Sequence, residues 1–437
     1  MRKISKISLV AAVAVAGFST ANAQPLEEAI KNVDVSGSVV YRYNNYDDSE
    51  NLNQSENNNY KIGLNLSSKV NDYVKFNSRF IVGGADGGFT KLDSKKDSAN
   101  GDGGADVTLT NAYFGFTAIP NTVVNIGKQG LTTPYTVATD INGNEQTGTG
   151  ILALSTFGPI TAGAGYFNAT NIGDSNETSA AVTGNALSAT NATKRNAINT
   201  VAQNGYDMYV ATIQGDLDFV KLEAWYAGMQ NTFGSYTLAA TSNLDLAENA
   251  KIGLEARYVN LQLNNTAIEK TVTATEPNGL TSDDNGMFRV AVDGKFSIVN
   301  ARLAYTMTDK DGGLTALDNN AKNTSLGWFI TSNGVADADY FQAALGADIL
   351  DNLNFTAHYG NLKADANDAG KSTINSHSLL GMMNGEELKQ QEVYGQLTYK
   401  MSKNLTTYLR YGQFEQKIDG VKDIDQNAGR LQVAYTF

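Results

Sequence analysis

Short segments in which apolar and polar residues alternate recur from residue 33 to residue 437, and this pattern limits the possible folds more than any other feature. Within one such segment, Val39 and Tyr41 would lie on one face of a strand, and Ser38 and Arg42 on the other. A period of two is typical of a β-strand with one apolar and one polar side. The segments that fit lie at 33–44, 60–68, 73–83, 107–117, 123–129, 151–157, 160–168, 206–215, 219–228, 233–243, 250–260, 287–295, 298–307, 339–349, 354–361, 390–401, 405–414 and 428–437.

The connections between these segments alternate in length. Short turns fall at 69–72, 118–122, 158–159, 216–218, 244–249, 296–297, 350–353 and 402–404, and long loops rich in Gly, Asn and Asp fall at 45–59, 84–106, 129–150, 169–205, 261–286, 308–338, 362–389 and 415–427. Soluble β-sandwiches show no such strict alternation, whereas bacterial outer-membrane barrels have short periplasmic turns and long extracellular loops. The sequence therefore predicts an all-β fold, a transmembrane antiparallel β-barrel of about 18 strands. Sixteen strands are the alternative, because predicted boundaries shift by ~2–4 residues.

Both ends of the chain fit export to an outer membrane. Residues 1–23 begin with cations, continue with a short apolar run and end in Ala21-Asn22-Ala23, which predicts a signal peptide that is cleaved. Residues 24–437 would then form a single barrel domain. The last nine residues, from Gly429 to Phe437, alternate as far as a terminal aromatic residue, as expected for the strand that closes such a barrel.

Composition narrows the function further. The chain carries a net charge of −12, which disfavours nucleic acid as a partner because nucleic acid selects basic surfaces. It contains no cysteine, so an exported form has no disulfides and must rely on hydrogen bonding and packing. A hydrophobic fraction of 41% is too high for disorder. A barrel with a wet interior reconciles this polarity with an ordered fold, because half of each strand need not be apolar.

Strand parity predicts which charged residues face the interior of the barrel. Six cations would form one contiguous, pore-lining basic wall, because closure makes the first and last strands neighbours: Arg42, Lys61, Lys75, Arg79, Arg410 and Arg430. Across the barrel, the expected interior charges have mixed signs: Lys221, Glu223, Glu255, Arg257, Arg289, Asp293, Lys295 and Arg302. A barrel of 16–18 strands encloses an aqueous channel. The clustering of one sign on one wall therefore indicates a channel that sorts solutes by charge.

The chain resembles the major outer membrane porin family of Campylobacter and its relatives. The stretches that carry the resemblance are residues 25–37 (PLEEAIKNVDVSG), Gly127-Lys128-Gln129, Thr139-Asp140 with Gly148-Thr149-Gly150, and residues 431–437 (LQVAYTF). The resemblance implies an 18-stranded, homotrimeric, general-diffusion porin in the outer membrane of a Gram-negative bacterium, with one inward-folded loop after the fifth strand. Its expected partners are outer-membrane lipid, lipopolysaccharide, and the small hydrophilic solutes and ions that pass through.

The loop at 129–150 would be the inward-folded constriction loop. It carries Asp140 and Glu145, which we expect to form an acidic surface opposite the basic wall. Lys128 resembles the basic residue that porins place near such a constriction. Strict alternation would point Lys128 toward lipid, so its place in the basic wall requires a β-bulge at the strand end.

The remaining loops set the expected ion preference. Acidic residues gather in the loops of the outer mouth: Asp47, Asp48, Glu50, Glu56, Asp102, Asp106, Asp283, Asp284, Asp309 and Asp311. They would attract cations, which predicts a mild cation preference that the basic wall partly offsets.

Alternative functions remain on the same barrel. A solute-specific channel would need a track of aromatic side chains along the lumen. Strand parity places only Trp225, Tyr394 and Tyr408 inside, so general diffusion is favoured. A surface adhesin on the same barrel is the other alternative. The chain has two histidines, His358 and His377, without a catalytic constellation, so we expect no enzyme.

No cofactor is expected either. The Asp/Gly-rich loops lack the twelve-residue calcium pattern, so they predict turns. A divalent cation such as calcium between Asp140 and Glu255 stays open as an alternative.

Overall fold

The computed structural model describes residues 33–50, 53–84, 87–92, 104–172, 207–264, 284–310, 312–364 and 387–437. The expected signal peptide at 1–23 lies outside the described residues, as do Asp102, Asp283, Asp311 and His377. No helix in the described part of the chain is long and apolar enough to cross a membrane.

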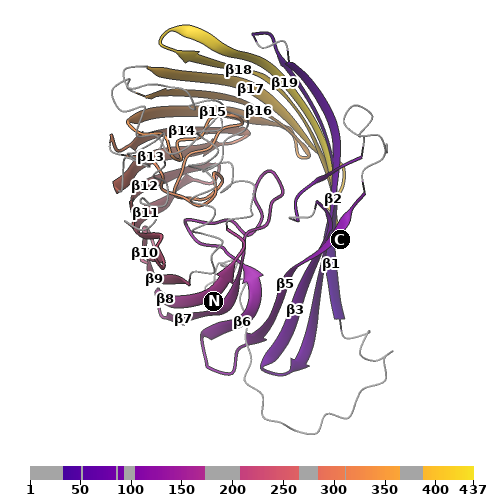
Figure 1. The fold of residues 1–437 in the computed structure, drawn as a ribbon, viewed down its shortest axis with the longest axis vertical. Coiled ribbons are helices and arrows are strands. Elements are labelled where there is room, and N and C mark those ends of the chain that lie inside the picture. Colours follow the sequence, from indigo (N-terminus) through magenta and orange to yellow (C-terminus); the bar gives the residue numbers. More distant parts are fainter. Residues whose placement is uncertain are drawn as a thin grey trace, which may run out of the picture.

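The described residues form one closed antiparallel sheet (Figure 1). Its strands are β1 (Val33–Asp48), β2 (Asn53–Asn71), β3 (Val74–Gly83), β4 (Thr90–Lys91), β5 (Asp106–Phe116), β6 (Thr122–Gly130), β7 (Thr147–Phe157), β8 (Ile160–Thr170), β9 (Met208–Asp216), β10 (Lys221–Met229), β11 (Phe233–Ala247), β12 (Ala250–Leu263), β13 (Asp284–Phe296), β14 (Val299–Thr308), β15 (Ala338–Leu350), β16 (Leu353–Ala364), β17 (Leu388–Lys400), β18 (Leu405–Ile418) and β19 (Val421–Thr436). The two-residue β4 pairs only with β2, and β3 pairs directly with β5. The barrel wall therefore has 18 strands, which confirms the predicted fold.

Backbone pairing between the first and last strands closes the barrel. Tyr41 of β1 lies opposite Val433 of β19, and the register continues without a shift over the whole contact. Beyond it, Gly37 donates its N–H to the Phe437 carbonyl at 2.9 Å, and Phe437 donates to the Gly37 carbonyl at 3.1 Å. A Cβ at Gly37 would lie 2.3 Å from the Gly63 carbonyl and 2.7 Å from the Phe437 ring, so this close approach requires glycine.

Two of the connections expected to be long polar loops are instead mostly strand. Within 45–59, β1 continues to Asp48 and β2 begins at Asn53; within 415–427, β18 continues to Ile418 and β19 begins at Val421. Asp419 (φ 53°) and Gly420 (φ 78°) form the tight turn of the second hairpin, in the left-handed conformations that two-residue hairpins require. These hairpin ends are mostly polar, with too few apolar residues to show the alternation used to find strands.

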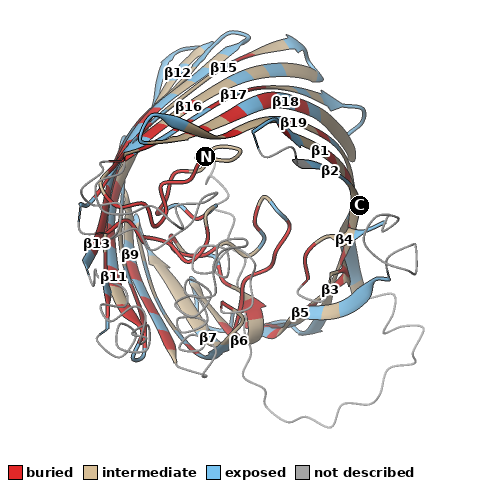
Figure 2. Cartoon of the chain, turned by 45° about the horizontal axis from the view of Figure 1, so that its top comes forward, coloured by how far each residue is buried: buried red, intermediate tan, exposed pale blue. Residues whose placement is uncertain are grey.

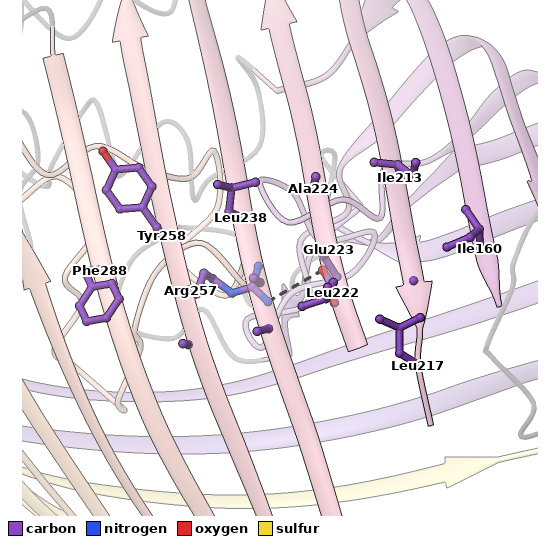
Figure 3. Close-up of a pocket in the computed structure, with 14 residues that line it drawn as sticks. Ile160, Ile213, Leu217, Leu222, Glu223, Ala224, Leu238, Arg257, Tyr258 and Phe288 are labelled. Carbon is purple, nitrogen blue, oxygen red and sulfur yellow. Dashed lines mark ion pairs between the residues drawn. The ribbon is translucent and has the colours of Figure 1, made fainter. Parts of the chain in front are cut away.

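The two faces of the wall differ as the alternation predicts. Large apolar side chains such as Leu222, Leu238 and Phe288 are exposed on the outer face. On β8 to β13 they border a recess of about 530 Å³, shown in Figure 3, where small side chains such as Ala240 and Ala256 leave room between them. Buried residues gather instead on the inner face and on loops inside the barrel (Figure 2). The packed core of this protein therefore lies within the lumen, between the wall and the loops that enter it.

Candidate channel constriction

The first inward loop, residues 131–146, connects β6 to β7 and runs inside the barrel (Figure 2). Leu131 and Tyr135 anchor it: both are almost fully buried in an apolar cluster that includes Phe167 of β8 and Leu261 of β12. Thr237 Oγ1 donates to the Tyr135 hydroxyl at 2.9 Å, which ties the loop to β11. The loop that the sequence predicts as the constriction thus enters the lumen.

Glu145 attaches this loop to the basic wall. Its Oε1 lies 2.9 Å from Lys61 Nζ and 2.8 Å from Arg79 Nη2, and Arg79 also donates to Asn65. Burial alone would raise the pKa of Glu145, but the hydrogen bond from Arg79 and the charges of Lys61 and Arg79 hold this pKa below its ordinary 4.5. The expectation that Glu145 lies opposite the basic wall is therefore wrong. It docks on that wall, because burying the carboxylate requires cationic partners.

Asp140 has a different role, within the loop itself. Its carboxylate accepts the backbone N–H and the side-chain amide of Asn144, both at 2.8 Å. Its carbonyl accepts the N–H of Gly143, which has φ 86°. Asp140 thus closes a tight turn. The neighbouring Ile141 carbonyl then accepts a hydrogen bond at 2.9 Å from Nη2 of Arg42, the second contact between loop and wall.

A second inward loop, residues 312–337 between β14 and β15, also enters the lumen, although its sequence pattern predicts only a long loop. The two loops bond directly: the Leu317 N–H donates to the Tyr135 carbonyl at 2.8 Å, and Gln146 Nε2 donates to the Leu317 carbonyl at 2.9 Å. Its apolar run Trp328-Phe329-Ile330 is unusual for an exposed loop and is the signal that could have revealed it.

The second inward loop docks on the wall of mixed charge. Glu255 pairs with Arg257 at 3.0 Å and with Arg289 at 2.6 Å, and Arg289 also donates to the Lys322 carbonyl of the loop at 2.8 Å. Figure 3 shows the same wall, where Arg257 also faces Glu223 across 4.0 Å. Because the acids here are matched by arginines, this wall is nearly neutral where it holds the loop.

Glu392 of β17 fixes the other side of the second inward loop. It is 2% exposed, and its carboxylate accepts three successive backbone N–H groups, from Trp328, Phe329 and Ile330, at 2.8–3.4 Å. Packing is tight here, since a Cβ at Gly327 would overlap this carboxylate. The arrangement places the Trp328 and Phe329 rings inside the barrel.

Three arginines of the basic wall have no carboxylate within ion-pair distance among the described residues. Arg42 donates to Gln432 at 2.8 Å, Arg430 to Asn44 at 2.7 Å, and Arg410 to Gln396 at 2.6 Å. All three are at most 9% exposed and lie on the neighbouring strands β1, β18 and β19. Their neutral acceptors leave their charge uncompensated, so this part of the lumen has a net positive potential.

The remaining two predicted members of the basic wall lie away from the constriction. Lys75 is exposed near the start of β3, and no ion pair of it is seen within the described ranges. Lys128 shares the face of Ile126, which is 44% exposed on the outer surface, and its Nζ donates to the Leu109 carbonyl at 2.8 Å. Placing Lys128 in the wall was wrong, because the pairing of β6 continues through it without the register shift that a bulge would cause.

Comparison with known proteins agrees with this geometry. The family model of the Campylobacter major outer membrane protein matches residues 1–437, the whole chain. The chain belongs to this family. The protein is thus a porin, a multi-pass channel of the outer membrane. No curated protein sequence matches the chain.

Solved structures show the same fold at low sequence identity. OpdL of Pseudomonas aeruginosa matches with a TM-score of 0.64 and 14% identity, over 93% of this chain and 99% of OpdL. OprD of Pseudomonas aeruginosa matches with a TM-score of 0.63 and 16% identity, over 92% of this chain and 93% of OprD. OccAB1 of Acinetobacter baumannii matches with a TM-score of 0.65 and 14% identity, over 93% of this chain and 97% of OccAB1.

The two carboxylates considered for a divalent cation are otherwise engaged: Asp140 with Asn144, and Glu255 with two arginines. In the part of the chain that the structure describes, no three His, Cys, Asp or Glu side chains are placed to hold a metal.

Proposed function

We propose that this porin is a general-diffusion channel that passes small hydrophilic solutes and ions. The observation that carries the proposal is the meeting of the two inward loops, through Leu317, Tyr135 and Gln146, inside a wide and polar barrel. The first loop is held by a buried ion pair and the second by hydrogen bonds to buried charged side chains, so they narrow the passage without filling it as a folded plug domain would. Water and small polar solutes then pass, while large or apolar molecules are excluded by size and by the charged lining.

A mild preference for cations is part of this proposal. Acidic side chains are exposed at the ends of the strands that face the outer mouth: Asp47, Glu50, Glu56, Asp106, Asp284 and Asp309. They raise the local concentration of cations at the entrance. The three uncompensated arginines oppose them deeper in the lumen, which keeps the preference mild.

Two further proposals concern assembly. We propose that residues 1–23 are removed as a signal peptide and that the porin assembles as a homotrimer in a membrane that contains lipopolysaccharide. The family resemblance supports both. N-terminal sequencing of the mature protein tests the first. Migration of unboiled and boiled samples on a denaturing gel tests the second, since a monomeric unboiled band would contradict it.

A liposome-swelling series and a planar bilayer test the channel proposals. For general diffusion, swelling rates should fall smoothly with solute mass, from glycerol through hexoses to disaccharides. A rate that saturates for one sugar alone would contradict it. Under a KCl gradient, the reversal potential should have the sign of cation preference, and the opposite sign would overturn that part of the proposal.

One observation favours the alternative of a solute-specific channel. The second inward loop adds Trp328 and Phe329 to the lumen aromatics Tyr394 and Tyr408, and Trp328 packs edge-on against Tyr394 with ring centroids 5.4 Å apart. This is more aromatic surface than parity alone predicts. The adhesin alternative rests on loops that lie largely outside the described residues.

A further inference from the structure

A recess of about 440 Å³ lies beside the constriction, where the ends of β1, β2 and β19 approach both inward loops. Its lining includes Tyr46, Asn142, Trp328, Phe329, Gln426 and Arg430. It therefore combines a cation, a group of aromatic rings and neutral hydrogen-bonding groups. No part of the diffusion mechanism requires such a combination.

The positive charge at this recess is concentrated and forms no ion pair with a described residue. The Arg430 guanidinium lies 5.8 Å from the centre of the Trp328 ring, and that of Arg410 lies 5.1 Å from it. Neither arginine has a carboxylate within ion-pair distance in the described residues. Asp48 also borders the recess, but its Oδ1 accepts the backbone N–H groups of Glu50 at 3.1 Å and Asp425 at 3.3 Å.

The aromatic wall is held in a defined shape. The Trp328 and Phe329 rings stack with centroids 4.8 Å apart, and Tyr46 packs edge-on against Phe329 at 6.1 Å. Glu392 binds the backbone of both loop residues, so the rings are pre-positioned. Pre-positioning lowers the entropy lost when a flat molecule packs against them.

We propose that this recess is a binding site for small aromatic carboxylates, at which Arg430, supported by the charge of Arg410, pairs with the carboxylate, and Trp328 and Phe329 contact the ring. A guanidinium pairs with a carboxylate through two parallel hydrogen bonds. Aromatic rings favour offset or edge contacts with a second ring. The proposal rests on the proposed diffusion channel, through which such a solute reaches the recess, and it adds a saturable step for one class of solute.

Tryptophan fluorescence provides a direct binding test. The chain has only two tryptophans, so Trp225→Phe leaves Trp328 as the sole reporter. With this variant in detergent, 4-nitrobenzoate should quench the emission in a saturable manner. The cation 4-nitrobenzylammonium, which has the same chromophore, should give only the weak linear quenching of random collisions. Equal quenching by the two probes would overturn the proposal.

Substitutions then assign the binding to this site. Arg430→Gln, added to Trp225→Phe, should raise the half-saturating concentration of 4-nitrobenzoate at least tenfold. Lys75→Gln removes a cation from the same wall, away from the recess, and should leave it unchanged. Heat-modifiable mobility on a gel checks that each variant is folded. If Arg430→Gln does not fold, Arg430→Lys replaces it and should raise the half-saturating concentration of 4-nitrobenzoate by a smaller factor. An unchanged half-saturating concentration in the variant that folds would contradict the site.

A planar bilayer separates this proposal from the proposed function. Benzoate should reduce the KCl current with saturation, whereas acetate and benzylammonium at equal ionic strength should not. Trp328→Leu should remove the difference between benzoate and acetate, each measured relative to the KCl conductance of the same variant. Normal KCl conductance without a block by benzoate would refute the binding site and leave the proposed channel intact. Absence of KCl conductance would refute the proposed channel, and the fluorescence titration would then decide whether the site binds the aromatic carboxylate.

Discussion

Lys61 of β2 and Glu145 of the first inward loop form an ion pair with 2.9 Å between Nζ and Oε1, and both side chains are at most 6% exposed. The pair joins residues 84 positions apart in the chain. Because Arg79 shares the same carboxylate, one loop acid pairs with two wall cations and leaves one positive charge in excess. The loop is therefore attached to the basic wall, and the field across the lumen arises mainly from the three arginines that have no carboxylate partner.

Glu145→Gln should loosen the first inward loop. It leaves Lys61 and Arg79 buried without a carboxylate, and breaking a buried pair in this way costs about 3–5 kcal/mol. We expect noisier single-channel currents and a reversal potential shifted toward anions, measured in a planar bilayer. Glu56→Gln, at an exposed acid of the mouth, is the matched control and should leave current noise unchanged. Equal noise in both variants would show that the ion pair does not hold the loop.

Glu392→Ala should release the second inward loop. Three successive backbone N–H groups would lose their acceptor, and each hydrogen bond to a charged group contributes about 1.5–3 kcal/mol. Glu392→Gln keeps one acceptor oxygen and should give an intermediate effect. Limited proteolysis of the purified porin, followed by mass spectrometry of the fragments, should show new cleavage near Trp328. Resistance equal to the wild type in both variants would contradict the anchoring role.

Arg430→Glu should shift the channel toward cations. A change of two unit charges about 8 Å from a passing ion contributes about 1 kcal/mol at the dielectric constant of water, or roughly fivefold in the permeability ratio. The new carboxylate can pair with Arg42 or Arg410, so we expect the variant to assemble. The reversal potential under a KCl gradient measures the shift, with Lys75→Glu as the control for a cation distant from the three arginines. An equal shift in the control would contradict the special position of Arg430.

Acidification should affect the two loop acids differently from ordinary carboxylates. Burial raises the pKa of Asp140 above its ordinary 3.8, against the hydrogen bonds from Asn144, whereas the pKa of Glu145 lies below 4.5. Asp140 is thus protonated at a higher pH than an ordinary aspartate. The stability contributed by ionised Glu145 is complete above its ordinary pKa and is lost as the pH falls through the lowered value. Reversal potentials measured from pH 7 to pH 3 should shift toward anions as these acids are protonated, and Asp140→Asn should reduce that shift without affecting the loss of fold that follows protonation of Glu145.

The alternation of side chains predicted most of the barrel because it is a local property. Parity alone places Arg42 and Arg430 inside and Leu222 outside, since successive residues of any strand point to opposite faces. It also indicated 18 strands and the seam between the first and last. Parity also points Lys128 outward, as observed; its placement in the basic wall was wrong because it required a bulge that the register does not contain.

The constriction depends on contacts between distant parts of the chain, which no local pattern encodes. The sequence marked Glu145 as a loop acid, but whether it faces or joins the basic wall depends on where Lys61 and Arg79 stand once the barrel has closed. In the sequence, Trp328 is only an aromatic residue in a long loop. Its position inside the barrel depends on the hydrogen bonds from three backbone N–H groups of that loop to Glu392 on β17. The wall follows from side-chain periodicity along each strand. The path of both inward loops instead follows from the requirement that each buried charge find its partner, and partners meet only in the folded barrel.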